Sequence, residues 1–195
     1  MHPKAILPFF FFLLTIASTL PETCAPNNGI MTTPTYGTTG AIFTICAQTT
    51  ILSSPLPIYD VLTNFPCYAA WNTFVYAIDL PSNYTTPYVG LQMTFHTSGL
   101  ILGFNTTSNE LVTYLEPDAT PPFVSWRLNA GVLGVLMQAE HVSALWDLGN
   151  GSTSYVSWET YYGAGALATL ALEANLQTQF EVQGQELKER IEGGG

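Results

Sequence analysis

The alternation of apolar and polar residues predicts a chain of many strands that ends in one long helix. Segments rich in β-branched and aromatic residues alternate with clusters of Gly, Pro, Asn and Ser, which is the pattern of extended strands separated by turns. The strands that we expect are 41–52, 73–80, 88–97, 100–104, 111–116, 123–128, 138–148 and 152–162. The apolar period changes over 164–192, where one helical stripe contains Leu172, Leu176, Phe180, Leu187 and Ile191. We expect Gly184 to kink this helix, because glycine weakens a helix interior.

Two short helical segments are expected between the first two strands, within the stretch SPLPIYDVLTNFPCYAAWNTFVYAID at 54–79. Ser54 suits the N-cap position, and Pro55 suits the first helical position. This helix must end before Pro66, since proline disfavours helical geometry in the residue that precedes it. The stretch 67–71 predicts a second helical turn, with Asn72 capping the turn into the next strand.

The sequence Gly149-Asn150-Gly151-Ser152 predicts a hairpin, because Asn-Gly suits the positive φ values of a tight turn. A two-residue loop would place Val142 opposite Glu159 and turn His141 to the other face of the sheet. A loop longer or shorter by one residue would place His141 opposite Glu159. We favour the first register, in which Glu159 is a structural carboxylate near the start of the helix and His141 lies on the outer face.

The composition of the chain excludes one class of function. The 195 residues suit one domain, and 47% hydrophobic with 9% charged residues supplies ample material for a core. The formal net charge is −10, with four Lys or Arg in total. Nucleic-acid binding needs a basic surface that neutralises phosphate, so no nucleic-acid partner is expected. Anionic membrane surfaces would also repel this chain.

The N-terminus predicts export. Lys4 precedes an apolar run over 5–17, which is shorter than the roughly 20 residues that span a bilayer, and small residues follow it. We therefore interpret 1–19 as a signal peptide, and expect a secreted protein without stable membrane insertion once this segment is removed. Asn83, Asn105 and Asn150 begin Asn-x-Ser/Thr triplets and are predicted glycosylation sites. The stretch 20–40 predicts an extended leader, and 193–195 a frayed tail.

The cysteines Cys24, Cys46 and Cys67 are odd in number, which implies one bridge and one leftover thiol, or no bridge. The sequence does not choose the pairing, although Cys24 could pin the leader. No Cys-x-x-Cys motif occurs and the chain has three His, so we predict no metal site and no cofactor. The strand spacing of His96 and His141 gives no support to a metal site shared with a carboxylate.

The order of strand, two short helices, antiparallel strands and terminal helix is that of the helix-grip fold. The residues SSPLPIYDVLTNFPCYAAWNTFV also resemble the opening of the START-like (SRPBCC) polyketide cyclase/dehydrase and lipid-transport proteins. Members commonly show Val-Leu-Thr-Asp-Phe and then Trp-Asn-Pro-Phe, where this chain has Asn64 and Thr73 in place of Asp and Pro. The resemblance extends over about 42–192.

The resemblance implies an α+β helix-grip domain over 41–192. In this fold a curved antiparallel sheet of six to seven strands wraps around a long C-terminal helix, and two short helices follow the first strand. A cavity between sheet and helix would bind a hydrophobic small molecule, such as a lipid, a sterol or a polyketide-like compound. Its candidate ligand-binding residues are Trp71, Met93, Phe95, Trp126, Met137, Trp146, Tyr155, Trp158, Tyr161, Leu172, Leu176 and Phe180. Strand alternation allows only about half of the strand residues among them to face inward, and a dense core is the alternative role. For Trp71 and Tyr68 we favour core packing.

The candidate catalytic residues are His141, Glu159 and Arg127, each on weak grounds. An acid/base pair of His141 and Glu159 needs both side chains on one face of the sheet. Arg127 faces opposite Trp126, and we expect Trp126 inside and Arg127 in solvent. The predicted function is therefore a secreted protein that binds a hydrophobic small molecule. A polyketide cyclase or dehydratase-like enzyme using the same cavity, and a non-catalytic secreted interaction protein, are the alternatives.

Overall fold

The computed structural model describes residues 20–24, 29–129 and 136–194, so the predicted signal peptide lies outside the described residues. The strands are β1 Ala41–Ile51, β2 Val75–Asp79, β3 Gln92–Ile101, β4 Phe104–Glu116, β5 Phe123–Leu128, β6 Gln138–Asp147 and β7 Thr153–Tyr162. The helices are α1 Pro55–Thr63, α2 Ala166–Thr169 and α3 Glu173–Glu192, with 3₁₀ turns η1 Phe65–Ala70 and η3 Leu170–Leu172. In the described part of the chain, none of the helices is long and apolar enough to cross a membrane.

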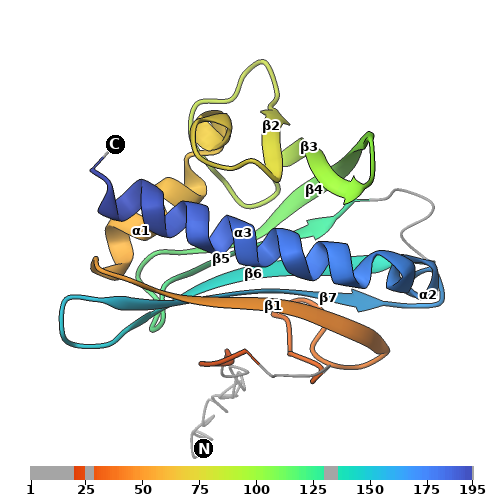
Figure 1. Cartoon of the computed structure of the whole chain (residues 1–195), viewed down its shortest axis with the longest axis horizontal. Helices are drawn as coiled ribbons and strands as arrows, with labels where there is room; N and C mark the ends of the chain where they lie inside the picture. The colour runs from red at the N-terminus through yellow and green to blue at the C-terminus, as the bar shows by residue number, and fades with distance from the viewer. Residues whose placement is uncertain (1–19, 25–28, 130–135, 195) are drawn as a thin grey trace, which may run out of the picture.

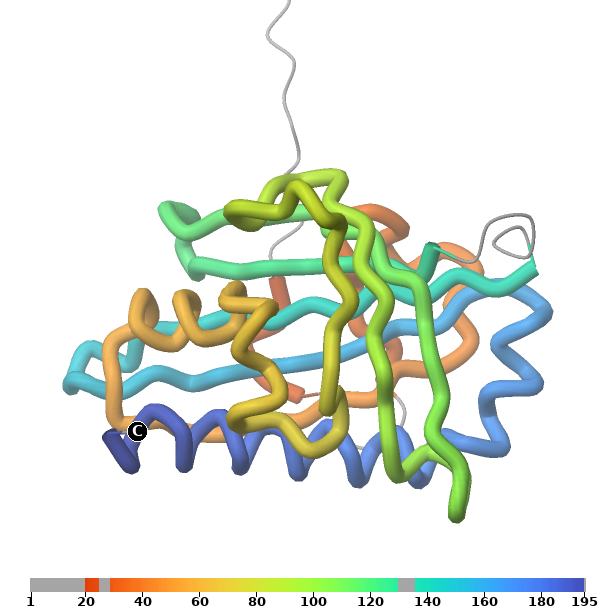
Figure 2. The backbone as a smooth tube through the Cα atoms, turned by 90° about the horizontal axis from the view of Figure 1, so that it is seen from above, coloured from red at the N-terminus to blue at the C-terminus, as the bar shows by residue number. Residues whose placement is uncertain are grey.

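The strands form one antiparallel sheet in the order β1-β7-β6-β5-β4-β3-β2, which curls around α3 (Figures 1 and 2). Leu176, Phe180 and Leu187 of α3 are buried in the core on the concave face of this sheet. This arrangement confirms the helix-grip prediction. The helical stripe read from the sequence is thus the surface that the sheet covers.

The short helices α1 and η1 contribute the aromatic core at one end of the domain. Tyr68 is fully buried and donates its hydroxyl to the carbonyl oxygen of Leu62 at 2.9 Å. Trp71 packs on Tyr68, with ring centroids 5.0 Å apart, and Asn72 accepts the backbone N–H of Val75 at 2.7 Å. These contacts confirm core packing for the two aromatics and the capping role of Asn72.

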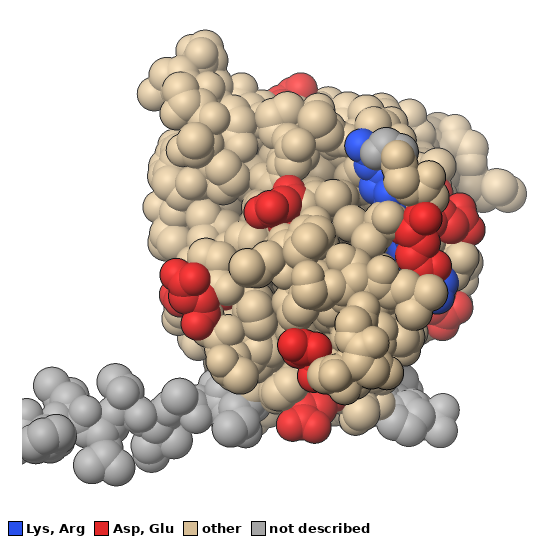
Figure 3. Space-filling view, turned by 90° about the vertical axis from the view of Figure 1, so that its left-hand side faces the viewer, with Lys and Arg blue, Asp and Glu red and all other residues tan. Residues whose placement is uncertain are grey.

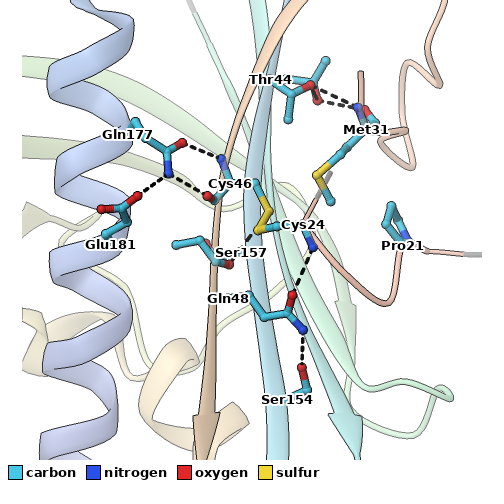
Figure 4. The surroundings of a disulfide bond; sticks show 12 residues. Pro21, Cys24, Met31, Thr44, Cys46, Gln48, Ser154, Ser157, Gln177 and Glu181 are labelled. Carbon is cyan, nitrogen blue, oxygen red and sulfur yellow. Dashed lines mark hydrogen bonds between the residues drawn. A yellow bond between two sulfur atoms is a disulfide. The ribbon is translucent and has the colours of Figure 1, made fainter. Parts of the chain in front are cut away.

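The leader packs on the convex face of the sheet, opposite α3. A disulfide joins Cys24 of the leader to Cys46 of β1, and Cys67 is free and exposed. Figure 4 shows β1 between the leader on one side and α3 on the other, where Gln177 bonds the backbone of Cys46. The leader therefore gives β6 and β7 a second buried face.

This second face corrects the predicted role of two tryptophans. Trp146 donates its indole N–H to the carbonyl of Pro21, and Trp158 donates to the carbonyl of Thr32, both at 3.1 Å. Strand alternation places both rings under the leader, so they do not line a cavity beside α3.

The same face holds a buried carboxylate and the one arginine of the sheet. Glu140 accepts the backbone N–H of Thr35 at 2.9 Å, the Thr35 hydroxyl at 2.6 Å and the Thr113 hydroxyl at 2.9 Å. Arg127 donates to the hydroxyl of Tyr36 at 3.2 Å. Trp126 is buried on the inner face, as the sequence predicts. The predicted solvent position of Arg127 is wrong, because the leader half-buries this side chain and supplies its hydrogen-bond partner.

Several predicted boundaries and the kink at Gly184 differ from the structure, and β3, for example, is Gln92–Ile101 instead of 88–97. The predicted strands 100–104 and 111–116 belong to a long β3–β4 hairpin that turns at Leu102 and Gly103, where Gly103 has φ 79°. The predicted helix 164–192 is divided into α2, η3 and α3. Gly184 does not interrupt α3. A Cβ at this position would lie 3.0 Å from Oγ1 of Thr49, so glycine lets α3 approach β1 closely.

Candidate functional site

A cavity of about 670 Å³ lies between the concave face of the sheet and the helical segment 169–183. Aromatic and aliphatic side chains from β2 to β7 and α3 form most of its wall. The lining residues are Phe74, Val75, Phe95, Thr97, Leu100, Thr106, Thr107, Ser108, Asn109, Glu110, Trp126, Leu128, Asn129, Met137, Ala139, His141, Glu159, Tyr161, Thr169, Leu172, Leu176, Phe180 and Gln183. The size falls within the range of roughly 300–1,000 Å³ that is usual for small-molecule sites.

The structure brings a little over half of the predicted ligand-binding residues to this cavity. Those that line it are Phe95, Trp126, Met137, Tyr161, Leu172, Leu176 and Phe180. Trp71, Met93 and Tyr155 are packed into the core instead, and Trp146 and Trp158 lie under the leader. The dense-core alternative therefore applies to Trp71, Met93 and Tyr155, which are buried among core side chains.

The β6–β7 hairpin has the register that we did not favour. His141 pairs with Glu159, and Leu148 donates its backbone N–H to the carbonyl of Ser152 at 3.0 Å. The loop therefore has three residues, 149–151, in which Gly149 and Gly151 have φ 72° and 82°. The extra residue shifts the register by one and turns His141 to the concave face, so the predicted outer-face position is wrong.

His141 is enclosed by aromatic rings on the cavity wall. Its imidazole stacks on Trp126 with centroids 4.4 Å apart and planes inclined by 13°, and it lies 5.0 Å from the ring of Phe180. Nε2 lies 3.2 Å from the hydroxyls of Ser143 and Ser157. Burial lowers the pKa of His141 to about 3, so the ring is neutral near neutral pH. We assign Nε2 as the acceptor of the two hydroxyls, which places the ring proton on Nδ1.

Two carboxyl groups face the same cavity. Glu159 of β7 accepts the hydroxyl of Tyr161 at 2.8 Å, and burial raises the pKa of Glu159 to about 7. Burial, followed by the charge of Glu159, raises the pKa of Glu110 on β4 to about 8. These causes are those expected for acids that lose their hydration beside a like charge.

Sequence reasoning missed Glu110, because it ends the polar stretch NTTSNE between two predicted strands. The register Glu110↔Leu128 and Val112↔Trp126 places it on the inner face. If the predicted strand 111–116 had been extended by two residues toward the N-terminus, the alternation of inward and outward side chains would have placed Glu110 on the same face as Val112.

The cavity thus combines an apolar wall with a few groups that can exchange or share protons. These are the two carboxyls, the Tyr161 hydroxyl and the neutral imidazole of His141. Arg127, the third candidate catalytic residue, lies on the opposite face and takes no part. The residues described contain no group of three or more His, Cys, Asp or Glu side chains that could hold a metal ion.

Comparison with known proteins supports the fold at low sequence identity. No protein family model matches the sequence, and no curated protein matches it. A hypothetical protein from Helicobacter pylori is similar with a TM-score of 0.66 and 13% identity, over 87% of this chain and 99% of that one. A START superfamily protein from Mycobacterium smegmatis has a TM-score of 0.60 and 16% identity, over 78% and 99%.

The Zhui aromatase/cyclase from Streptomyces sp. R1128 is similar with a TM-score of 0.61 and 13% identity, over 76% of this chain and 93% of that one. At such identities the likeness concerns the backbone arrangement and not the side chains of the cavity. The chain therefore has the helix-grip fold that START superfamily proteins and aromatase/cyclases share.

Proposed function

We propose that this chain is an exported protein that binds an apolar small molecule between the sheet and α3. The observation that carries the proposal is the cavity of about 670 Å³ with walls built from Phe95, Trp126 and Phe180. Burying a ligand there would gain roughly 25 cal/mol per Å² of apolar surface, before the costs of ordering. The fold shared with START superfamily proteins supports the same function.

Three features support export. The apolar run at 5–17 has the length of a signal-peptide core. The disulfide Cys24–Cys46 fits an oxidising compartment, because cytosolic thiols are mostly kept reduced. Asn83, Asn105 and Asn150 are all exposed, as glycosylation requires.

The first test examines the protein as cells release it. Native mass spectrometry before and after organic extraction should show the loss of a bound small molecule. The extracted protein should then take up Nile red, a neutral dye that fluoresces in apolar sites. A protein that leaves the cell empty and does not take up the dye would contradict the proposal. Two outcomes would contradict export: a protein that stays inside the cell, or a protein that still carries its first 19 residues.

A second candidate function is acid/base catalysis in the same cavity. It is favoured by Glu110 and Glu159, whose pKa values are raised to about 8 and about 7, so that one can donate a proton while the other accepts it. Cyclisation or dehydration of a poly-β-ketone would use this chemistry. The test incubates the protein with a poly-β-ketone and monitors product formation by mass spectrometry. Glu159→Gln should abolish this turnover. A wild-type protein without turnover would remove this candidate.

The third reading, an interaction protein without a ligand, requires a filled core. The cavity beside α3 therefore favours the two ligand-binding functions over this one.

A further inference from the structure

The cavity holds acidic groups without a basic side chain to pair with them. Glu110 is only 6% exposed and lies inside the domain on β4, and Glu159 approaches the same space from β7. No Lys or Arg is among the residues that line the cavity. A carboxylate buried without a positive partner is costly, and it normally stays protonated instead.

None of the Lys and Arg residues of the described chain lines the cavity. Arg127 bonds Tyr36 on the convex face. Lys188 lies near the C-terminal end of α3, where its ammonium donates to the carbonyl of Thr50 at 2.8 Å and lies 3.5 Å from Glu192. Arg190 follows on the last turn of α3. Figure 3 shows basic side chains in one area of the face it presents, with acidic side chains beside them. When Glu110 and Glu159 ionise, the described residues therefore supply no Lys or Arg in the cavity to pair with them.

A second, independent feature of the same cavity is the ring nitrogen Nδ1 of His141. This side chain is 5% exposed and lines the cavity. Its hydrogen bonds to described residues all involve Nε2, so Nδ1 has no partner among them. Because the ring lines the cavity, a ligand there can supply the hydrogen-bond acceptor that Nδ1 lacks.

The walls also suit a cation. Trp126 and Tyr161 line the same space as the two carboxyl groups, and aromatic faces attract ammonium groups that have lost their water. An anionic ligand would meet two carboxyl groups and no positive charge, so the site selects against it.

We propose that the cavity prefers ligands that carry a protonated amine on an apolar body, with the ammonium bonded to Glu110 and Glu159 and a hydrogen-bond acceptor of the ligand on Nδ1 of His141. This inference rests on the proposed function, because it assumes that the cavity binds a small molecule. To that function the inference adds the charge of the ligand and the residues that bind the charged group.

Displacement of Nile red by three matched compounds tests the inference. The probes are 1-naphthylmethylamine, 1-naphthalenemethanol and 1-naphthoic acid, which share one ring system and differ in charge. At about pH 8, where the carboxyl groups can ionise, we expect the amine to bind about tenfold or more tightly than the alcohol, and the acid to bind most weakly. At about pH 5 the advantage of the amine should shrink, because both carboxyl groups are then protonated.

Two variants assign the effect to the pair. Glu110→Gln and Glu159→Gln should each remove most of the amine's advantage over the alcohol. The matched control is Glu116→Gln, at the exposed end of β4, which should change neither.

The outcomes separate the two proposals. If Nile red binds but the alcohol competes as well as the amine, the preference for amines is overturned and small-molecule binding stands. The same holds if the amine's advantage survives in both Gln variants. If Nile red and all three compounds fail to bind the extracted protein, both proposals fail.

Discussion

Glu159 lies directly opposite His141 in the β6–β7 ladder, yet each side chain has a different hydrogen-bond partner. Nε2 of His141 bonds Ser143 and Ser157, while Glu159 accepts the hydroxyl of Tyr161. The two groups therefore do not form the acid/base pair that one of the two registers predicted. They are separate polar groups of one cavity. His141 is a neutral hydrogen-bond donor, and Glu159 is a carboxyl group that titrates.

We expect the imidazole of His141 to stay neutral between about pH 5 and 8, because burial lowers its pKa to about 3. Long-range ¹⁵N–¹H spectra of protein labelled at histidine should show the Nδ1–H tautomer for this residue throughout the range. Free histidine in the same buffers titrates and serves as the reference. A titration midpoint above pH 5 for His141 would contradict the assignment.

Replacing Glu110 should flatten the dependence of stability on pH. The folded-state pKa of Glu110 is raised to about 8, so its contribution to stability is fully present below its unfolded pKa of about 4.5 and is lost as pH rises through 8. Between about pH 6.5 and 7.5 this one group should lower the free energy of unfolding by about 1.4 kcal/mol per pH unit. Glu110→Gln should remove that part of the slope.

Urea unfolding at several pH values measures the slope directly. His141 contributes little to it in this window, because its depressed pKa costs stability only as pH falls below about 6.5. Glu159 contributes in the same direction as Glu110, up to about pH 7. Glu116→Gln, an exposed change on the same strand, should keep the wild-type slope. Equal slopes for Glu110→Gln and the wild type would show that Glu110 ionises normally.

Much of the architecture could be predicted because local patterns and the fold agree. The apolar stripe of 172–191, the short helix that ends before Pro66 and the β-branched runs each identify their element without knowledge of the rest. The inward position of Trp126 was predicted from the charge of Arg127, since a lone arginine is rarely buried. Arg127 itself is nevertheless half-buried, because the leader covers the face that was expected to meet solvent.

The face that His141 presents could not be predicted, because it depends on the length of one loop. Gly149 and Gly151 both accept positive φ, so two-residue and three-residue loops suit the same sequence, and one residue reverses the strand's faces. The packing of the leader over Trp146 and Trp158 could not be predicted for another reason. The leader has no apolar period, and its position is set by distant contacts such as the bond from Cys24 to Cys46.

Removing the disulfide should loosen the leader. Cys24 and Cys46 are 22 residues apart, and Cys24→Ser should lower the free energy of unfolding by about 3 kcal/mol on the chain-entropy estimate. The fluorescence of Trp158, whose indole bonds the leader, should move toward that of solvated tryptophan. The control Cys67→Ser removes an exposed, free thiol and should change stability by no more than about 0.5 kcal/mol. Equal stabilities for Cys24→Ser and the wild type would mean that the leader is held without the bond.

The contact between Thr35 and Glu140 should anchor the other end of the leader. The Thr35 hydroxyl donates to the carboxyl group of Glu140 at 2.6 Å, and an intramolecular hydrogen bond contributes about 0.5–1.5 kcal/mol. Thr35→Val should lower stability by that amount in urea unfolding. Thr32→Val is the matched control in the same segment, because the contact that Thr32 makes with Trp158 uses its carbonyl oxygen. A smaller loss for Thr35→Val than for Thr32→Val would contradict this role.

Filling the cavity should separate binding from folding. Ala139 lines the cavity on β6, two residues before His141, and a larger side chain there has to extend into the hollow. Ala139→Phe should weaken Nile red binding by about tenfold or more, at a cost in stability of no more than about 3 kcal/mol, which overpacking usually incurs. Leu102→Phe places the same ring at a site that is 97% exposed on the β3–β4 turn, and should leave the dye affinity unchanged. Because the dye could also bind exposed apolar residues at this hairpin tip, the comparison decides where it sits. Unchanged binding in a folded Ala139→Phe protein would place the dye outside the space beside α3.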